Sequence, residues 1–287
     1  MADVRRGVPL LEKVGIAAFC IVCLILFISI RFPYDTFRGT LEGSLSKALD
    51  QPVTLGHIHA RFPFGCTVDG MSVGRNPYAK ELIIYPHLLS LLTGSFGLDI
   101  QAVFPSGSIV CSFDKPFGIA KKSVKTSFKM ENFDTSLIHT LFSTSIQPEG
   151  FITGTVEMTG TSSSIRNMGG KASIVWKDGF IPLTDSQMPI DGIRFKVMQM
   201  NSRIDNGILT LEKLDLKGDV SGSAKGAVRL MDPLRRSRLS LSGEITLPQS
   251  IAASLGAGQG LSPQGMVRFS LRGTLDKPRF RTLGSSK

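Results

Sequence analysis

Alternation of apolar and polar residues dominates this chain from about residue 150 to its C-terminus. In the segment M-V-R-F-S-L-R-G, Val267, Phe269 and Leu271 fall on one face of an extended chain, and Arg268 and Arg272 fall on the other. The segments R-L-S-L-S-G and I-R-F-K-V repeat the pattern; their apolar positions are Leu239 and Leu241, and Ile193, Phe195 and Val197. A period of two is typical of strands with one apolar and one wet face. The sequence therefore predicts a mainly β protein with antiparallel strands.

Turn and helix signals divide this strand pattern. The tripeptides D-N-G at Asp205–Gly207 and K-D-G at Lys177–Gly179 each predict a β-hairpin. Four short helices are expected, and they begin near Tyr34, Pro86, Asn132 and Pro248. The first of them places Phe37, Leu41, Leu45 and Leu49 at four-residue spacing, which predicts an amphipathic helix.

The N-terminal region contains one uninterrupted apolar run, Val14–Ile30. As a helix its length is roughly 26 Å, close to the lower limit for crossing a bilayer core. The residues that follow it, R-F-P-Y, offer no small-residue cleavage site, so the run predicts an uncleaved transmembrane anchor rather than a signal peptide. Basic residues in the preceding arm predict a cytoplasmic N-terminus. We expect an arm at 1–13, an anchor at 14–31, an α+β part at 32–150 and a β-rich part at 151–287.

Charge and cysteine content narrow the class of protein. The formal net charge of +10 suits anionic headgroups or nucleic acid, or a solvated strand face. We expect no nucleic acid partner, because the anchor places most of the chain outside the cytoplasm. Cys20 and Cys23 lie within the apolar run, whereas Cys66 and Cys111 belong to the exported part, where a disulfide between them is possible.

Motifs for catalysis are missing from the sequence. It contains no G-x-S-x-G, no Walker motif and no H-E-x-x-H. The G-A-G-Q-G segment at 256–260 follows an expected helix rather than a strand, which favours a flexible link over a phosphate loop. His57 and His59 could share a metal ion, yet two histidines at this spacing are more often surface residues, and carboxylates occur singly. The sequence therefore predicts a protein that is not an enzyme and has no cofactor or metal.

The order of the segments resembles the type II secretion system protein N family (GspN), which is similar to the wider AsmA-like group of envelope proteins. The resemblance is carried by the anchor followed by F-P-Y and a short helix, by Q-P-V-T-L-G-H-I-H-A-R-F-P-F-G-C-T-V-D-G-M-S-V-G, and by A-K-E-L-I-I-Y-P-H-L-L-S-L-L-T-G. The later segments G-I-L-T-L-E-K-L-D-L-K-G and L-R-G-T-L-D-K-P-R-F belong to the same pattern. Together these pieces cover nearly the whole chain, although each motif alone is degenerate.

The resemblance implies a single-pass protein of the bacterial inner membrane with its bulk in the periplasm. It also implies that an antiparallel sheet follows the anchor, either as an AsmA-like curved sheet with an apolar groove or as a closed sandwich or barrel. Candidate groove residues share the apolar face of the expected strands. They are Trp176, Phe195, Val197, Leu209, Leu211, Leu239, Leu241, Val267, Phe269 and Leu271.

Two functions follow as expectations from this resemblance. The first is a non-catalytic assembly or structural factor of a type II secretion system, whose partners are other secretion proteins. The alternative is an AsmA-like lipid-binding or lipid-transfer protein, whose partners are membrane lipids. The sequence leaves the oligomeric state open.

Overall fold

A computed structural model shows a mainly β protein. It describes residues 15–16, 19–20, 23–24, 27, 34–61, 65–74, 76–87, 90–91, 93–117, 123–138, 147–160, 167–182, 192–232, 236–246, 248 and 266–283. Fifteen strands form one antiparallel sheet, in which consecutive strands pair from β3 to β15. At the N-terminal edge both β1 and β2 pair with β3. The sheet runs continuously through the expected boundary at residue 150, because β7 pairs with β8.

The elements have the following bounds. They are α2 Tyr34–Leu49, β1 Val53–Leu55, β2 Ile58–Arg61, β3 Gly65–Val73, β4 Asn76–His87, β5 Ser95–Val103, β6 Ser108–Pro116, β7 Val124–Asp134, β8 Glu149–Gly160, β9 Met168–Pro182, β10 Gly192–Asp205, β11 Ile208–Lys217, β12 Ser221–Arg229, β13 Arg238–Thr246, β14 Met266–Thr274 and β15 Pro278–Leu283.

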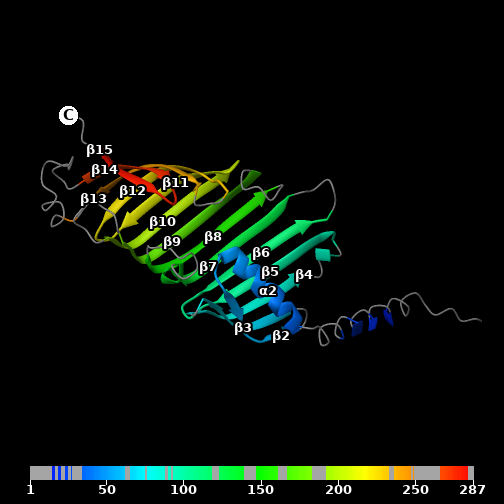
Figure 1. The fold of residues 1–287 in the computed structure, drawn as a ribbon. Coiled ribbons are helices and arrows are strands. Elements are labelled where there is room, and N and C mark those ends of the chain that lie inside the picture. The colour runs from blue at the N-terminus through cyan, green and yellow to red at the C-terminus, as the bar shows by residue number, and fades with distance from the viewer. Residues whose placement is uncertain are drawn as a thin grey trace, which may run out of the picture.

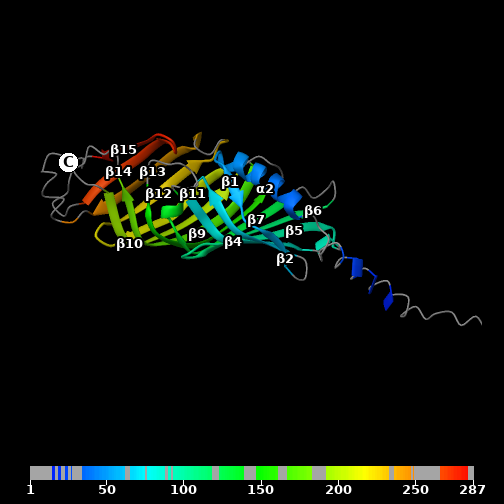
Figure 2. The same cartoon turned by 60° about the horizontal axis from the view of Figure 1, so that its bottom comes forward.

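The sheet is open and curved, and α2 lies on its concave side. Figure 2 shows the C-terminal strands β13–β15 curling over β9 and β10 on the same side as α2. Figure 1 shows that α2 covers the N-terminal end of the sheet and leaves the region around β8–β10 uncovered by that helix. The prediction of a mainly β chain with an antiparallel curved sheet is thus confirmed.

Helix α2 forms where the four-residue spacing of leucines predicts it. Leu41, Leu45 and Leu49 pack against the buried residues of β1–β4. Two hydrogen bonds fix its direction: the Val53 N–H donates to Ser46 Oγ at 2.8 Å, and the Leu55 N–H donates to Glu42 Oε1 at 2.8 Å. The later residue of β1, Leu55, therefore bonds to the earlier residue of the helix, Glu42. Helix α2 thus runs antiparallel to β1.

The antiparallel order gives the sheet two long rims. One rim contains the connections that follow the even-numbered strands β2 to β14, and we call it the even rim. The odd rim carries the connections after the odd-numbered strands from β3 onward. Ser95↔Pro116 pairing at the even rim and Val103↔Ser108 pairing at the odd rim mark the two ends of β5 and β6. The two rims carry different surface residues.

The structure confirms one of the two predicted hairpins and contradicts the other. The D-N-G hairpin is confirmed: Asn206 and Gly207 join β10 to β11 with φ of 48° and 71°. The K-D-G hairpin is wrong, because Lys177–Gly179 lie inside the single strand β9. Between Glu149↔Phe180 and Phe151↔Lys177, β9 has one residue more than β8, and Asp178 takes a φ of 49° there. The motif forms a β-bulge, since both neighbouring strands continue past it.

Two expected helices begin later than the sequence suggests. Pro86 and His87 end β4, and the helical residues that the structure describes in this segment are Ser90 and Leu91. Asn132 belongs to β7, and the helical residues that follow are 136–138. The fourth expected helix, after Pro248, and the glycine-rich segment 256–260 lie outside the described residues.

The predicted anchor is described at isolated positions. Both of its ends, Val14 and Ile30, lie outside the described residues. The described positions are helical, and Ile16, Phe19, Leu24 and Phe27 are exposed. Among the described residues, no helix is both long and apolar enough to cross a bilayer.

Candidate functional site: an apolar trough

The concave face of the sheet is lined by rows of apolar side chains that run across the strands. In an antiparallel ladder, directly opposed residues point to the same face. The central row contains Cys66, Ile84, Ile100, Cys111, Phe128, Val156, Ala172, Ser202, Leu211, Gly226, Leu241 and Leu271, one from each strand β3–β14. The row beside it contains Val68, Leu82, Ala102, Ile109, Met130, Gly154, Ile174, Met200, Leu214, Ala224, Gly243 and Phe269. We call this lined face the trough.

Two shorter rows flank these on the same face. Toward the even rim lie Leu98, Phe113, Thr126, Met158, Gly170, Ile204, Leu209, Val228, Leu239 and Gly273. Toward the odd rim lie Ile152, Trp176, Met198, Leu216, Gly222, Ile245 and Val267. The lining is thus almost entirely aliphatic, aromatic or glycine.

The convex face is polar. Cross-strand ion pairs join Lys171 to Glu157 at 3.2 Å and Arg268 to Glu244 at 3.8 Å, and all four side chains are exposed. Exposed pairs of this kind contribute little stability, about 0–1 kcal/mol each. The convex face is therefore the wet side of the alternation, and the trough is the apolar side.

The N-terminal part of the trough is covered and dry. Beneath α2, Leu55, Val68 and Val73 are at most 2% exposed. Tyr78 and Phe133 each meet Phe104 edge to face, with ring centroids 5.2 and 5.1 Å apart. Burial raises the pKa of the Tyr78 hydroxyl above its usual range. This part has the burial of an ordinary protein core.

The C-terminal part of the trough is less covered. Ile174, Met200, Leu214 and Leu241, which belong to the two central rows, are each only half-buried. Their strands already have neighbours on both sides, so the remaining exposure is toward the trough. Among the described residues, no helix or second sheet lies over this part.

Trp176 makes an aromatic ring contact and a hydrogen bond in the C-terminal part of the trough. Its indole N–H donates to the Glu149 carbonyl at 3.1 Å, and its ring meets the Phe195 ring edge to face at 5.2 Å. The Phe195 ring covers Gly179, where a Cβ atom would lie 2.1 Å from it. Glycine is required there because any side chain would displace the ring.

Most of the predicted groove residues occur together on this face. Trp176, Phe195 and Val267 belong to one buried cluster. The remaining members of the apolar rows are Leu209, Leu211, Leu239, Leu241, Phe269 and Leu271. Whether the trough holds lipid stays a prediction.

Val197 is the exception. Met198 pairs with Trp176 and packs in its cluster, and Val197 pairs with the exposed Lys177. Phe195 and Met198 both face the trough although they are three positions apart, so the alternation is interrupted between them. The expected common face of Phe195 and Val197 is therefore wrong. The cause is the irregularity at the Asp178 bulge on the paired strand.

The disulfide that the sequence leaves possible is not formed. Cys66 and Cys111 are both free, and they share the central row. Two strands, β4 and β5, separate them, which places them three strand spacings or roughly 14 Å apart. A disulfide requires Cα atoms within about 7 Å. Burial raises the pKa of both thiols, and the Asp99 carboxylate raises that of Cys111 further.

No metal centre appears in the part of the chain that the structure describes. His59 Nδ1 lies 3.4 Å from an Asp69 carboxylate oxygen on the convex face. His57 precedes β2 and accepts a backbone hydrogen bond from Asp69 through its carbonyl. His139 lies outside the described residues.

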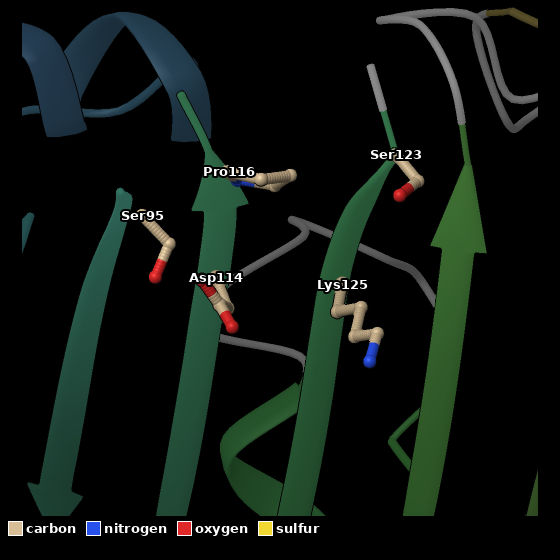
Figure 3. Close-up of a pocket in the computed structure, with 5 residues that line it drawn as sticks. All are labelled: Ser95, Asp114, Pro116, Ser123 and Lys125. Carbon is tan, nitrogen blue, oxygen red and sulfur yellow. The ribbon is translucent and has the colours of Figure 1, made fainter. Parts of the chain in front are cut away.

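A hollow of about 430 Å³ lies at the even rim. Figure 3 shows its lining, which comes from the ends of β5, β6 and β7: Ser95, Asp114, Pro116, Ser123 and Lys125. Phe113 faces the trough, so the next residue, Asp114, opens the hollow on the convex face. The charged groups of the hollow are the Asp114 carboxylate and the Lys125 ammonium group. A catalytic set would need a nucleophile in contact with a base, and this lining does not show such a pair.

Sequence reasoning missed the N-terminal half of the trough. Ile84, Ile100, Phe113 and Phe128 were not among the candidates, although they continue the same rows. The alternation that reveals the later strands is weaker here, because β4 contains the near-continuous apolar run L-I-I-Y.

Comparison with protein-family models, with curated proteins and with solved structures finds no match for this chain. The resemblance to the GspN family therefore remains an expectation from sequence.

Proposed function

We propose that the trough binds the acyl chains of membrane lipids, and that the protein holds or carries lipid at a membrane. The observation that carries this proposal is the continuity of the apolar rows beyond α2. From β8 to β14 one complete row, which runs from Gly154 through Ile174 and Leu214 to Phe269, stays only half-buried, although the neighbouring rows contain buried members such as Leu211 and Val267. Covering such a surface is favourable by about 0.8 kcal/mol per methylene group buried, and an acyl chain supplies a line of methylenes.

The shape of the lining suits an unbranched chain. The rows run across the strands, and glycines at positions 154, 226 and 243 leave space between larger side chains. Ser202 is the polar exception in the central row; it is 3% exposed, and its hydroxyl has no hydrogen-bond partner among the described residues. A site with so few polar groups would recognise chain rather than headgroup.

The placement of the protein belongs to the same proposal. The apolar run Val14–Ile30 would anchor it in a bacterial inner membrane with a cytoplasmic arm, and the sheet would lie in the periplasm. A lipid leaving that membrane would reach the trough without crossing water over a long distance.

Trp176 provides the direct test, because it is the chain's single tryptophan and lies in the trough. Full-length protein purified in mild detergent should carry phospholipid, visible by native mass spectrometry and lipid extraction. Fatty acids brominated along the chain should then quench Trp176 in a saturable way. Absence of both lipid and saturable quenching would refute the proposal.

A matched pair of variants separates binding from folding. Leu241→Asp places a charge in the central row, whereas Ser242→Asp places it one residue farther on the exposed convex face. The first variant should lose the bound lipid, and the second should keep it. Equal lipid content in both variants would place the lipid elsewhere.

A second candidate, an assembly role in a type II secretion system, has one feature in its favour. Strand β15 pairs only with β14 among the described strands and so ends the sheet with a free edge. A partner strand could add there by main-chain hydrogen bonding. The exposed Arg279 and Arg281 would favour an acidic partner segment. A cross-linker placed at position 281 should capture a secretion protein in cells if this role holds. A protein that carries the cross-linker but captures no partner would argue against the role.

A further inference from the structure

The exposed large apolar side chains of the sheet are concentrated on one rim. Leu91, Phe117 and Leu275 lie in connections that follow even-numbered strands. Phe96 and Ile208 are among the first two residues of the strands that come next, and each of the five side chains is at least 37% exposed. Within the described part of the sheet, Leu283 is the one such side chain at the odd rim. Single exposed apolar residues are normal, but their restriction to one rim indicates a surface that is not always in water.

The even rim is also basic. Its exposed cations outnumber its exposed anions in the described residues. The cations are Arg61, Lys115, Lys125, Arg229, Arg236, Arg238, Lys277 and Arg279, and the anions are Asp114, Asp205, Asp232 and Asp276. Apolar residues interspersed with cations match the boundary between anionic headgroups and acyl chains.

The chain reaches the sheet from the same side. Because α2 runs antiparallel to β1, its first turn lies toward the end of β2, where Arg61 pairs with Gly65 at the even rim. Figure 1 shows the start of α2 on the same side as the end of β4. Only residues 31–33 separate Tyr34 from the apolar run, and three residues span at most about 11 Å.

We propose that the even rim lies along the surface of an anionic phospholipid bilayer, so that the long axis of the trough is parallel to the membrane. The apolar rim residues enter the headgroup–acyl boundary, and the cations contact lipid phosphates. Ten strand spacings separate β4 from β14, so this contact extends roughly 48 Å along the sheet from Leu91 to Leu275.

This orientation goes beyond acyl-chain binding, since the trough could equally stand upright on its anchored end. An upright trough would keep Phe117 close to the membrane but would hold Leu275 far from it. A rim that binds a second copy of the chain would leave both residues away from lipid. The position of Leu275 therefore distinguishes these arrangements.

Tryptophan placement in the full-length protein tests the orientation. In a Trp176→Phe background, which keeps a ring against Phe195, single tryptophans are introduced as Phe117→Trp, Leu275→Trp or Leu283→Trp. Leu275 and Leu283 form a matched pair: they are 48% and 47% exposed, and they lie at opposite ends of β15. The proteins are reconstituted in vesicles of phosphatidylcholine and phosphatidylglycerol whose acyl chains carry bromine.

The expected result is asymmetric. Trp at 117 and 275 should shift to shorter wavelength and lose about half of its emission, because a residue inserted ~5–10 Å into the boundary lies near the bromines. Trp at 283 should be unaffected. Charge reversal by Lys277→Glu with Arg279→Glu should abolish the quenching at 275, whereas Lys217→Glu at the odd rim should not.

Other outcomes overturn the proposal. Quenching at 117 without quenching at 275 would show an upright trough, and equal quenching at 275 and 283 would show no rim preference. Quenching at neither position, with dimers in cross-linking, would assign the rim to a second copy. Ile208→Trp gives an independent position if Leu275→Trp does not fold. Acyl-chain binding is read separately from Trp176 in the otherwise unchanged protein, so either proposal can fail alone.

Discussion

The two ends of the trough have the same lining but different covers. At the N-terminal end, α2 places three leucines over β1–β4, and the residues beneath them are excluded from water. At the C-terminal end, the rows continue with similar residue types and include buried members such as Leu211 and Val267, yet the row from Ile174 to Phe269 stays half-buried. Burial of an apolar row thus depends on what lies over it and not on the row itself.

The comparison shows how one continuous sheet can serve two purposes. The covered end has the packing that stabilises a fold, with Val68 fully buried and three aromatic rings in edge-to-face contact. The uncovered end retains apolar surface that folding alone does not satisfy. Stability should therefore depend mainly on the first region, and ligand binding mainly on the second.

Removing a large side chain should separate the two ends most clearly. Leu55→Ala beneath α2 is expected to lower the free energy of unfolding by about 3 kcal/mol, because it leaves a cavity in a packed core. Leu241→Ala in the open end should cost about 1 kcal/mol, since Leu241 is only half-buried and leaves no closed cavity. Urea denaturation of lipid-free protein measures both. Equal losses would mean that the C-terminal end is as fully covered as the N-terminal end.

Glu42 should contribute the next largest effect, because it joins α2 to β1. Its Oε1 accepts from the Leu55 N–H at 2.8 Å and from Arg38 Nε at 3.0 Å. Glu42→Ala should lower the free energy of unfolding by about 1–2 kcal/mol at pH 7. Glu42→Gln keeps an acceptor oxygen and should cost less.

The pH dependence of Glu42 has a definite sign. The Leu55 hydrogen bond, followed by the Arg38 hydrogen bond, lowers the pKa of Glu42 from its ordinary value of 4.5. The stabilisation is therefore complete above the ordinary pKa and is lost as pH falls through the lower pKa of the folded protein. The stability difference between the unchanged protein and Glu42→Gln should narrow over this acidic range in urea titrations. A difference that stays constant down to pH 3 would contradict the assignment.

The sequence predicts the strands better than the connections between them. Alternation in R-L-S-L-S-G and M-V-R-F-S-L-R-G fixes which residues share a face, since the period of a strand is two. The D-N-G and K-D-G motifs are locally alike, yet one forms a hairpin and the other a bulge. The difference lies in the ladders that β9 makes with β8 and β10, which no local pattern contains.

What covers the apolar face could not be predicted either. Alternation gives an apolar face equally to a sandwich, a barrel and an open trough. The spacing of Leu41, Leu45 and Leu49 predicts a helix with an apolar side, but not the strands against which it packs. The relation of Cys66 to Cys111 shows the same limit: both belong to strands, and only the strand order places two further strands between them.

Cys66 and Cys111 offer the smallest effect and the sharpest local comparison, because only the first of the two thiols lies in the cluster beneath α2. Cys66 packs in the cluster beneath α2, whereas Cys111 lies farther along the central row. Both pKa values are raised by burial, so in a Cys20→Ser, Cys23→Ser background both should alkylate more slowly than a free thiol at pH 7.5.

Two perturbations should then act on different thiols. Glu42→Ala should raise the alkylation rate of Cys66 by about fivefold or more, because 1–2 kcal/mol of lost local stability changes an opening equilibrium by a factor of 5–30. Cys111 should respond little to that variant, and added acyl-chain ligand should slow its alkylation instead. Mass spectrometry of peptides containing each cysteine reads both rates in one sample. If loosening α2 accelerates both thiols equally, the covered and uncovered parts open as one unit, and the division of the trough into a structural end and a binding end is wrong.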